Sequence, residues 1–513
     1  MPSCPRRTLA PAAALALAFA LSLALPHPAP AAKAPTRSAL KGASPAGKLR
    51  AVKPRGKRGI VRRAAVQTTT SKLFGFNDNG ALQNVLTPSL DAELHTALGS
   101  KVVRFGFDWR WAEPAPGVYD FARYDALWAA MRARGIRPVI ILMFSPSWAN
   151  DWACNQYTSD CRIPPTPNHY ADAGRMAARL VQRYPDAAAI ELWNEQNLEH
   201  FWRSPNPEAY AALLKSVHGA VKAANRHMPV ISGGLSNVAP DVPGLSPREY
   251  LRRMYAAGAK RHLDGIGIHP YPFDVDTSRF YNALDDVRDV RDANGDKAKE
   301  LWISELGMTT MGRWAFSEAE QANVLRNLHR VVGRMPDVRA LLLHTVADDP
   351  NEPGYGLARG DLSPRPAFCA IAAERGTAYA CPPTVPQATP GADQTARWTA
   401  QDHLHAALDA ARSWYASYKT FAGFTQVQMA ARAPQLSSAA PPEPAQSGPS
   451  ADPRKIALYR TANPAELLLC NASQADRAYC IWTLRPDRVA YGAANGGTWD
   501  AAGAIMSGSS RIW

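Results

Sequence analysis

The sequence predicts a barrel of eight parallel β-strands with intervening helices, a (β/α)8 barrel over residues 71–385, followed by a small α+β module. Short apolar, β-branched runs alternate with helical patterns from about residue 71 onward, and eight such runs occur before the alternation stops. An open doubly wound sheet is the alternative. No Gly-rich phosphate loop follows the first predicted strand, which disfavours that alternative.

The eight predicted strands are mostly apolar, as strands buried on both faces require. They are Leu73–Asn77, Val102–Phe107, Pro138–Phe144, Ala189–Asn194, Val230–Leu235, Gly265–His269, Leu301–Glu305 and Ala340–Thr345. Helical stretches separate most of them. The clearest are Tyr124–Gly135, Tyr170–Tyr184, Glu208–Asn225, Pro247–Ala259 and Ser317–Arg334.

Residues 1–32 have the layout of a secretory signal peptide. Arg6 and Arg7 supply a positive start, Ala12–Leu25 is an apolar run, and Ala29-Pro30-Ala31 offers a small-residue cleavage site. A retained membrane anchor is the alternative, although the run is shorter than the ~20 residues that a bilayer span requires. We therefore expect a secreted or periplasmic protein with no stable membrane span after cleavage.

Residues 33–70 form a basic segment that we expect to be a disordered linker. Residues 1–70 hold 13 Lys or Arg and no acidic residue, so subtracting these 13 charges from the formal net charge of +14 leaves +1 for the rest. The basic excess is therefore local, and the near-neutral remainder does not predict nucleic-acid binding. An arm that binds anionic polysaccharide or membrane is the alternative to a linker.

Six of the seven cysteines follow the predicted signal peptide. Their proximity predicts three disulfides in an oxidising compartment, Cys154–Cys161, Cys369–Cys381 and Cys470–Cys480. Metal binding is the alternative, but no Cys-x-x-Cys spacing and no neighbouring His cluster accompanies them. No other pattern in the sequence implies a metal ion or an organic cofactor.

Residues 392–513 predict a separate small α+β module. Gln394–Lys419 has apolar residues at helical spacing on one side: Leu404, Leu408, Ala411, Trp414 and Tyr418. After a Pro, Ala and Ser-rich loop at 433–453, three short strands are expected: Lys455–Leu469, Ala478–Leu484 and Arg488–Gly492. The module resembles the soluble part of type IV pilin-like proteins, without their long apolar first helix. Carbohydrate binding and protein docking are both open as its role.

Two glutamates stand at the ends of predicted strands, Glu195 after Trp193-Asn194 and Glu305 after Ser304. In a (β/α)8 barrel the C-terminal strand ends meet at one mouth, where catalytic groups lie. Two carboxyl groups there suit the cleavage of a glycosidic bond, because one protonates the leaving oxygen while the other attacks the anomeric carbon. Ordinary strand-end carboxylates that face water are the alternative.

The barrel motifs occur in an order typical of clan A glycoside hydrolases, and the chain resembles families 39 and 5 of that clan over roughly residues 73–370. The motifs are Val103-Arg104-Phe105, Trp111-Ala112-Glu113-Pro114, Gly117-x-Tyr119-Asp120-Phe121, Trp193-Asn194-Glu195, His269-x-Tyr271 and Ser304-Glu305. Some family 39-like members process bacterial exopolysaccharides, and the chain is similar to those.

The resemblance implies that Glu195 is the general acid and base and that Glu305 is the nucleophile. The clan retains anomeric configuration, for which the two carboxyl groups lie about 5–5.5 Å apart. Arg104 and Tyr271 are expected to hydrogen-bond the nucleophile and keep it ionised.

Two further residues complete the expected site. Asn194 would contact the sugar 2-hydroxyl, and His269 would tune the general acid. A structural ion pair is the alternative for Arg104, and packing in the core is the alternative for His269 and Tyr271.

Aromatic rings flank the proposed mouth and could stack on sugar faces along an extended groove, which favours internal cleavage of a polymer. They are Trp109, Trp111, Trp148, Trp152, Tyr157, Trp202 and Trp314. Packing in the core is the alternative for each ring. The loop Asp151–Pro167 is expected to form a rim that a disulfide pins.

Clan members often place a Trp at the end of strand eight as a platform for the sugar. This chain has His344-Thr345 there. Either His344 substitutes for the Trp or another loop supplies the platform, so the sequence does not identify the sugar.

The first hypothesis is a retaining β-glycoside hydrolase that cleaves a polysaccharide internally, with a bacterial exopolysaccharide as the expected substrate. The second is a non-catalytic polysaccharide-binding or adhesion protein on a barrel scaffold, which has no need of an intact carboxylate pair. The third is an exo-acting β-glycosidase, which would release single sugars from an oligosaccharide or polysaccharide end.

Overall fold

The computed structural model describes residues 72–152, 162–237, 242–312, 314–418, 426–433, 457–460, 467–472, 477–485 and 488–495. The predicted signal peptide, the basic segment, the Cys154–Cys161 couple and most of the Pro-rich loop lie outside these residues, and so do the predictions made for them. Within the described part of the chain, every helix is too short or too polar to cross a bilayer.

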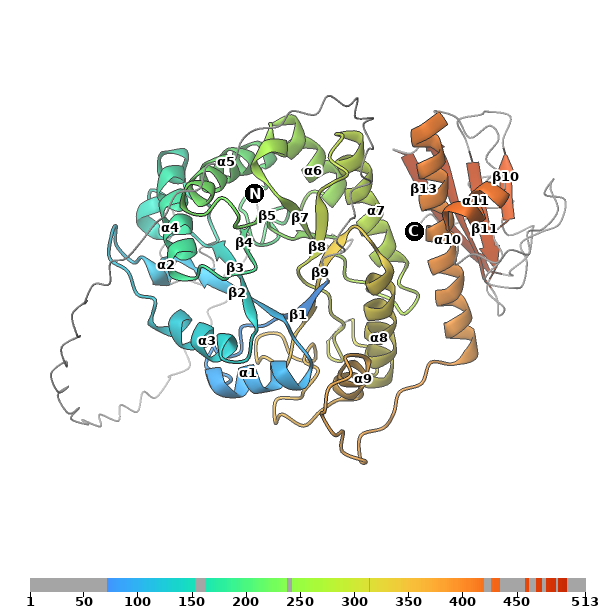
Figure 1. Ribbon diagram of the computed structural model, residues 1–513, viewed down its shortest axis with the longest axis horizontal. Coiled ribbons are helices and arrows are strands. Elements are labelled where there is room, and N and C mark those ends of the chain that lie inside the picture. The colour runs from blue at the N-terminus through green and yellow to red at the C-terminus, as the bar shows by residue number, and fades with distance from the viewer. Residues whose placement is uncertain are drawn as a thin grey trace, which may run out of the picture. The chain divides into compact units, whose positions relative to one another are not determined.

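Nine strand segments form one parallel sheet that closes into a barrel (Figure 1). They are β1 (Leu73–Asn77), β2 (Val102–Asp108), β3 (Arg137–Met143), β4 (Ala189–Leu192), β5 (Val230–Ser232), β6 (Leu235–Ser236), β7 (Gly265–His269), β8 (Glu300–Ile303) and β9 (Val338–His344). β1 pairs with both β2 and β9, and β5 pairs with β7 as well as β4, which closes the ring. β5 and β6 together replace the single predicted strand at 230–235. The predicted (β/α)8 barrel is therefore confirmed.

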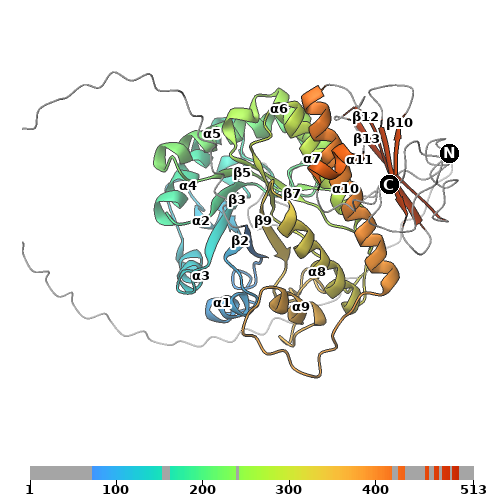
Figure 2. The same ribbon diagram turned by 45° about the vertical axis from the view of Figure 1, so that its right-hand side comes forward.

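Helices surround the sheet (Figure 2). They are α1 (Pro88–Ala97), α2 (Trp109–Ala112), α3 (Ala122–Arg132), α4 (Tyr170–Arg183), α5 (Pro207–Ala224), α6 (Pro247–Ala256), α7 (Ser278–Ala293), α8 (Glu318–Arg334) and α9 (Pro366–Glu374). Side-chain caps begin several of them: Thr87, Asn206 and Ser246 each accept a backbone N–H, and Ser317 forms a capping box with Glu320. The ends of the five predicted helices lie at most three residues from those of α3, α4, α5, α6 and α8.

Two predicted strands extended two residues too far. β4 ends at Leu192 rather than at Asn194, and β8 ends at Ile303 rather than at Glu305. The backbone explains the first difference, because Trp193 and Glu195 have φ angles of 70° and 43°, outside the strand region. Both glutamates therefore lie in loops that follow the C-terminal ends of their strands.

The C-terminal part contains α10 (Ala392–Tyr418), α11 (Gln426–Arg432) and a four-stranded antiparallel sheet of β10 (Ala457–Arg460), β11 (Leu467–Ala472), β12 (Arg477–Arg485) and β13 (Arg488–Asn495). Two strands stand where the single strand at 455–469 was expected. The predicted apolar side of the helix is buried except for Tyr418, which is 56% exposed because the helix ends there.

One of the three predicted disulfides is present, between Cys369 and Cys381. The pairing of β11 with β12 places Cys470 opposite Cys480 in the backbone register. The bond between these two cysteines stays a prediction.

Candidate active site

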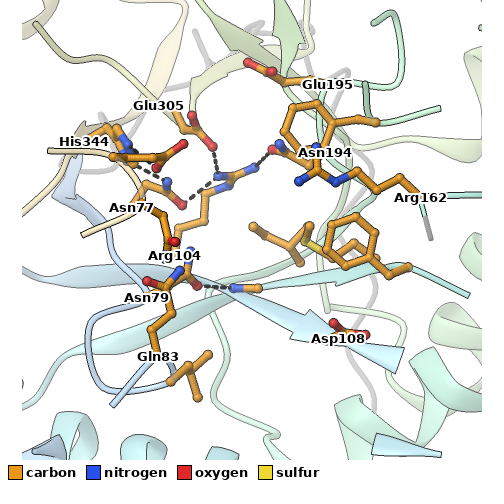
Figure 3. Close-up of a pocket in the computed structure, with 18 of the residues that line it drawn as sticks. Asn77, Asn79, Gln83, Arg104, Asp108, Arg162, Asn194, Glu195, Glu305 and His344 are labelled. Carbon is orange, nitrogen blue, oxygen red and sulfur yellow. Dashed lines mark hydrogen bonds and ion pairs between the residues drawn. The ribbon is translucent and has the colours of Figure 1, made fainter. Parts of the chain in front are cut away.

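A cavity of about 750 Å³ opens at the C-terminal ends of the barrel strands (Figure 3). Its wall includes Glu195 and Glu305. One carboxylate oxygen of each lies within 4.8 Å of the other and of a ring nitrogen of His269. This spacing is near the ~5–5.5 Å of retaining glycosidases and below the ~6.5–9.5 Å of inverting ones.

Arg104 lies at the floor of this cavity and holds four side chains in place (Figure 3). Its guanidinium donates to both carboxylate oxygens of Glu191, at 2.7 and 3.0 Å, and to Glu305 Oε1 at 2.5 Å. It also donates to the amide oxygens of Asn77 and Asn194, each at 2.7 Å. The Arg104 side chain is buried, so these hydrogen bonds satisfy a charge that is largely removed from water.

The surroundings of Glu305 favour its ionised form. Burial alone would raise the pKa of the carboxyl group, but the charges of neighbouring His269 and Arg104 outweigh it and lower the pKa from 4.5 to about 2. The Tyr271 hydroxyl donates to Glu305 Oε2 at 2.9 Å and adds to this effect. Burial also holds the pKa of Tyr271 well above 10, so the hydroxyl keeps the proton that it donates.

Glu195 has a different environment from Glu305. Its Oε1 lies 2.9 Å from Nδ1 of the fully buried His269, whose Nε2 contacts the Ser304 hydroxyl at 3.1 Å. The Ser304 hydroxyl donates to Glu191 Oε1 at 3.1 Å, so it accepts from His269 Nε2–H. A hydrogen bond between Nδ1 and Oε1 therefore joins the imidazole to the Glu195 carboxyl group.

Two adjacent glycines between β5 and β6 make room for this arrangement. A Cβ atom on Gly234 would lie 1.9 Å from His269 Nε2, and one on Gly233 would lie 2.3 Å from Gln196 Oε1. The Gly234 N–H also donates to Glu191 Oε1 at 2.9 Å. Position 234 therefore requires glycine, because the His269 imidazole that contacts Glu195 lies so close to the backbone there.

We expect Gly234→Ala to lower kcat/KM about 100-fold, because the new methyl group must displace a ring that has no free space to enter. Gly219→Ala in α5 is the matched control, since no atom lies within 4 Å of its added Cβ. The control should keep full activity and an unchanged or slightly raised Tm. Steady-state kinetics and thermal denaturation of both variants test this, and wild-type kinetics in Gly234→Ala would contradict the assigned place of His269.

Asn194 and His344 lie on opposite sides of the carboxylate pair (Figure 3). Because the Asn194 amide oxygen accepts from Arg104, its NH2 group is left to donate into the cavity. His344 Nδ1 lies 3.0 Å from Asn77 Nδ2, and Nε2 lies 3.0 Å from Glu352 Oε2. His344 thus stands at the end of β9, in the cavity wall, with a polar partner at each ring nitrogen.

Three of the rings expected at the mouth are in the core instead. Trp109, Trp148 and Trp202 are 1%, 8% and 2% exposed and do not line the cavity, so no face is open to a sugar. Trp109 and Trp148 pack edge to face and both donate to Glu113, to its carboxylate and its carbonyl oxygen respectively. Their expected role as stacking surfaces is therefore wrong. Trp109 and Trp148 support the loop after β2, and Trp202 packs against Trp193 and Tyr210.

The other expected rings are at the surface or outside the described residues. Trp111 is 49% exposed and lines the cavity. Trp314 is 40% exposed and contacts the cavity-lining Phe273 edge to face. Trp152 is 75% exposed and does not line the cavity, and Tyr157 belongs to the segment that is not described.

Sequence reasoning missed Glu191, the second partner of Arg104. A carboxylate within a fully buried four-residue strand was the signal for it, since such a charge needs a buried cation. It also missed cavity residues on loops: Phe144, Arg162, Phe201, Phe273, Glu352 and Tyr355. Their residue types do not indicate that they line the cavity, because the conformation of the loops brings them there.

Glu195, His269 and Glu305 have ligand atoms close enough to hold a metal ion together. Their partners favour proton transfer instead. Glu305 already accepts from Arg104 and Tyr271, and both ring nitrogens of His269 contact oxygens. A cation at this place would lie against the guanidinium of Arg104.

The fold and the site define a (β/α)8 barrel with an asymmetric carboxylate pair at its mouth, an arrangement that glycoside hydrolases use. No protein-family model matches the chain. A 127-residue stretch is 28% identical to a β-xylosidase of Geobacillus stearothermophilus and covers 23% of this chain and 25% of that protein. The match thus spans about a quarter of the relative's length.

The chain is also similar to solved structures of glycosidases. One is a family 39 glycoside hydrolase from Bacteroides cellulosilyticus WH2, with 22% identity, a TM-score of 0.49, and coverage of 60% of this chain and 63% of that one. Another is a monomeric β-xylosidase from Caulobacter crescentus CB15, with 20% identity, a TM-score of 0.47, and coverage of 59% and 67%. These relatives are of the kind that the barrel motifs predicted, and the exopolysaccharide-associated type stays a prediction.

Proposed function

We propose that this protein is a retaining β-glycoside hydrolase that acts on an oligosaccharide or a polysaccharide. The observation that carries the proposal is that two carboxyl groups, with oxygens within 4.8 Å of each other, have different surroundings. Glu305 is held ionised by Arg104 and Tyr271, whereas Glu195 has the His269 imidazole as its hydrogen-bond partner. One group is thus prepared to attack and the other to protonate.

In the first step, Glu305 attacks the anomeric carbon while Glu195 gives its proton to the leaving glycosidic oxygen. The C–O bond to the leaving group breaks as a glycosyl ester bond to Glu305 forms. Positive charge develops on the ring oxygen in between, and the Asn194 amide is placed to donate to the 2-hydroxyl as this happens. Arg104 keeps Glu305 oriented, and its ion pair with Glu305 becomes a weaker hydrogen bond when the carboxylate is converted to the neutral ester.

In the second step, Glu195 is a carboxylate and removes a proton from a water molecule that attacks the same anomeric carbon. The ester bond breaks, Glu305 leaves as a carboxylate, and two inversions restore the original configuration. His269 lies against Glu195 throughout, and the proton that Glu195 gives to the leaving oxygen in the first step is replaced by the proton that it removes from water in the second. The path through Ser304 to Glu191 fixes the orientation of the imidazole in both steps.

Two modes of action have support. Internal cleavage of a polysaccharide, including a bacterial exopolysaccharide, is supported by rings in the cavity wall, among them Trp111, Phe144, Phe201 and Phe273. Release of single sugars is supported by the matched stretch of a protein named β-xylosidase. Secretion or a periplasmic location is a further proposal, which the Cys369–Cys381 disulfide supports.

Product analysis tests both the reaction and the mode of action. Purified protein is incubated with aryl β-glycosides and a panel of defined polysaccharides, and the anomer formed first is identified by NMR. A β-anomer as the first product supports the retaining mechanism, and an α-anomer overturns it. Oligosaccharide products support internal cleavage, and single sugars support action at chain ends. Binding to one glycan without hydrolysis of any substrate would instead favour the non-catalytic adhesion protein.

A further inference from the structure

A second cluster of metal-ligating side chains lies apart from the carboxylate pair, between β1 and α1, the two blue elements of Figure 1. It consists of Asp78, which follows β1, and of Asp91 and His95, which are one helical turn apart on α1. All three are buried, with exposures of 3%, 1% and 0%. Each offers one ligand atom, and the three atoms lie within 4.8 Å of one another.

The polar atoms that face the centre of this cluster lack hydrogen-bond partners. They are Asp78 Oδ2, both carboxylate oxygens of Asp91, and His95 Nε2. Buried polar atoms are rarely left in this state, and two buried carboxylates side by side are especially costly without a cation. The cluster therefore offers four buried atoms with open ligand capacity.

The separations between these atoms distinguish a metal site from a hydrogen bond. His95 Nε2 lies 3.4 Å from Asp91 Oδ1 and 3.6 Å from Asp78 Oδ2. These distances exceed the 2.7–3.2 Å of an N–H···O hydrogen bond. Ligands about 2.0–2.2 Å from one tetrahedral zinc ion lie about 3.3–3.5 Å from each other, which the observed distances approach.

The outer contacts of the cluster also suit a bound metal ion. His95 Nδ1 lies 3.1 Å from the Ser100 hydroxyl, which orients the ring and leaves Nε2 toward the two carboxylates. Asp78 Oδ1 accepts the Gly80 N–H at 2.8 Å, which leaves Oδ2 for the centre. The ring of Phe76 packs edge to face on His95 and covers the site with apolar surface.

We propose that Asp78, Asp91 and His95 bind one divalent transition-metal ion, Zn²⁺ being the best match, with a water molecule or the second Asp91 oxygen as fourth ligand. Two carboxylates and a neutral imidazole cancel the charge of such an ion at this buried position. The ion would join β1 to α1 and fix the segment between them. That segment carries Asn79, Leu82 and Gln83, which line the cavity, so the metal would set the shape of that wall.

The sequence pattern alone concealed this site, because Asp78 is separated from the Asp91–His95 pair by the loop that the ion would hold. The rival arrangement is an imidazolium between two carboxylates without any metal. It has the same three residues but binds no zinc, so metal content decides between the two.

The test uses the full protein purified without chelator and reconstituted with Zn²⁺, then freed of loose metal by gel filtration. We expect one equivalent of zinc by plasma mass spectrometry. Addition of EDTA should lower the Tm by about 5–10 °C, and excess Zn²⁺ should restore it. Absence of bound zinc, together with a Tm that EDTA does not move, would overturn the proposal and leave the imidazolium arrangement.

Variants locate the metal once it is found. Asp91→Asn and His95→Gln keep the size of each side chain but should lose the zinc and the EDTA-dependent difference in Tm. Glu93→Gln is the matched control, because Glu93 is on the same helix and exposed, and it should behave as the wild type. Stoichiometric zinc in both cluster variants would place the metal elsewhere and overturn the assignment, whereas wild-type metal content is informative even if a variant fails to fold.

Discussion

Glu305→Gln is expected to lower kcat/KM by about 10⁴-fold or more on the aryl β-glycoside that the wild type hydrolyses fastest. The amide has nearly the same shape as the carboxylate, but its oxygen carries no charge with which to attack. Arg104 keeps its contact with Glu191, so the floor of the cavity should remain folded. The measurements are initial rates and a circular-dichroism melt of the same sample.

A smaller variant separates the loss of the nucleophile from general damage. Glu305→Gly leaves space at the same point, and added azide can then attack the anomeric carbon directly. Because this is one inversion, the product should be the α-glycosyl azide, whereas azide acting in a Glu195→Gly variant should give the β-anomer from the intact ester. Glu199→Gln is the control for a nearby exposed carboxylate and should keep wild-type rates. A Glu305→Gln enzyme with near wild-type activity would rule out this nucleophile.

The two glutamates have distinct surroundings although each follows a barrel strand. Glu305 contacts a guanidinium and a phenol, and Glu195 contacts an imidazole that is anchored through Ser304. Glu191 connects both sides, since it accepts from Arg104 and from Ser304. One buried carboxylate therefore anchors both Arg104, which contacts the nucleophile, and Ser304, which orients the imidazole next to Glu195.

The sequence was sufficient to predict the barrel and its mouth because strand-end position is a consequence of topology. Eight apolar runs in order place Glu195 and Glu305 on one rim whatever the loops do. The residue at which the fourth strand ends was not predictable. The left-handed backbone at Trp193 ends this strand early, and Trp is an unusual residue in that conformation. Residue type and spacing do not reveal such a turn.

The tryptophans show where residue type is insufficient. Trp109 and Trp111 are two residues apart, yet the first is buried against Glu113 and the second is half exposed at the cavity. Both would stack on a sugar equally well, and only the short α2 decides which ring faces outward. The same limit hid Glu352, because the loop after β9 brings it to His344.

Removal of the Arg104 guanidinium is expected to have the second largest effect. In Arg104→Met, Glu191 becomes a buried carboxylate without a cation, which costs about 3–5 kcal/mol of stability. We expect the Tm to fall by about 5–15 °C and kcat/KM to fall at least 100-fold at neutral pH. Arg104→Lys should be only partly better, because a single ammonium group cannot reach the four side chains that the planar guanidinium holds.

The pH dependence gives a readout that simple damage to the fold would not. Glu305 must be ionised to attack, and its pKa of about 2 in the wild type keeps it ionised throughout the ordinary pH range. Without Arg104, burial is less opposed and the pKa rises toward or above its ordinary value of 4.5. The acidic limb of kcat/KM should therefore move to higher pH. A limb that stays in place in Arg104→Met would show that Arg104 does not set the ionisation of the nucleophile.

The folding stability should also depend on pH through Glu305. A carboxyl group whose pKa is lower in the folded state than in the unfolded chain stabilises the fold above about pH 4.5, and this contribution is lost as the pH falls toward 2. Arg104→Met should therefore lose less of its remaining stability over that window than the wild type does. The double variant Arg104→Met/Glu191→Gln removes the stranded charge and should recover part of the Tm. The acidic limb of kcat/KM should not return to its wild-type pH, because the charge that acts on Glu305 is still missing. Recovery of both the Tm and the limb would show that Arg104 acts through folding alone.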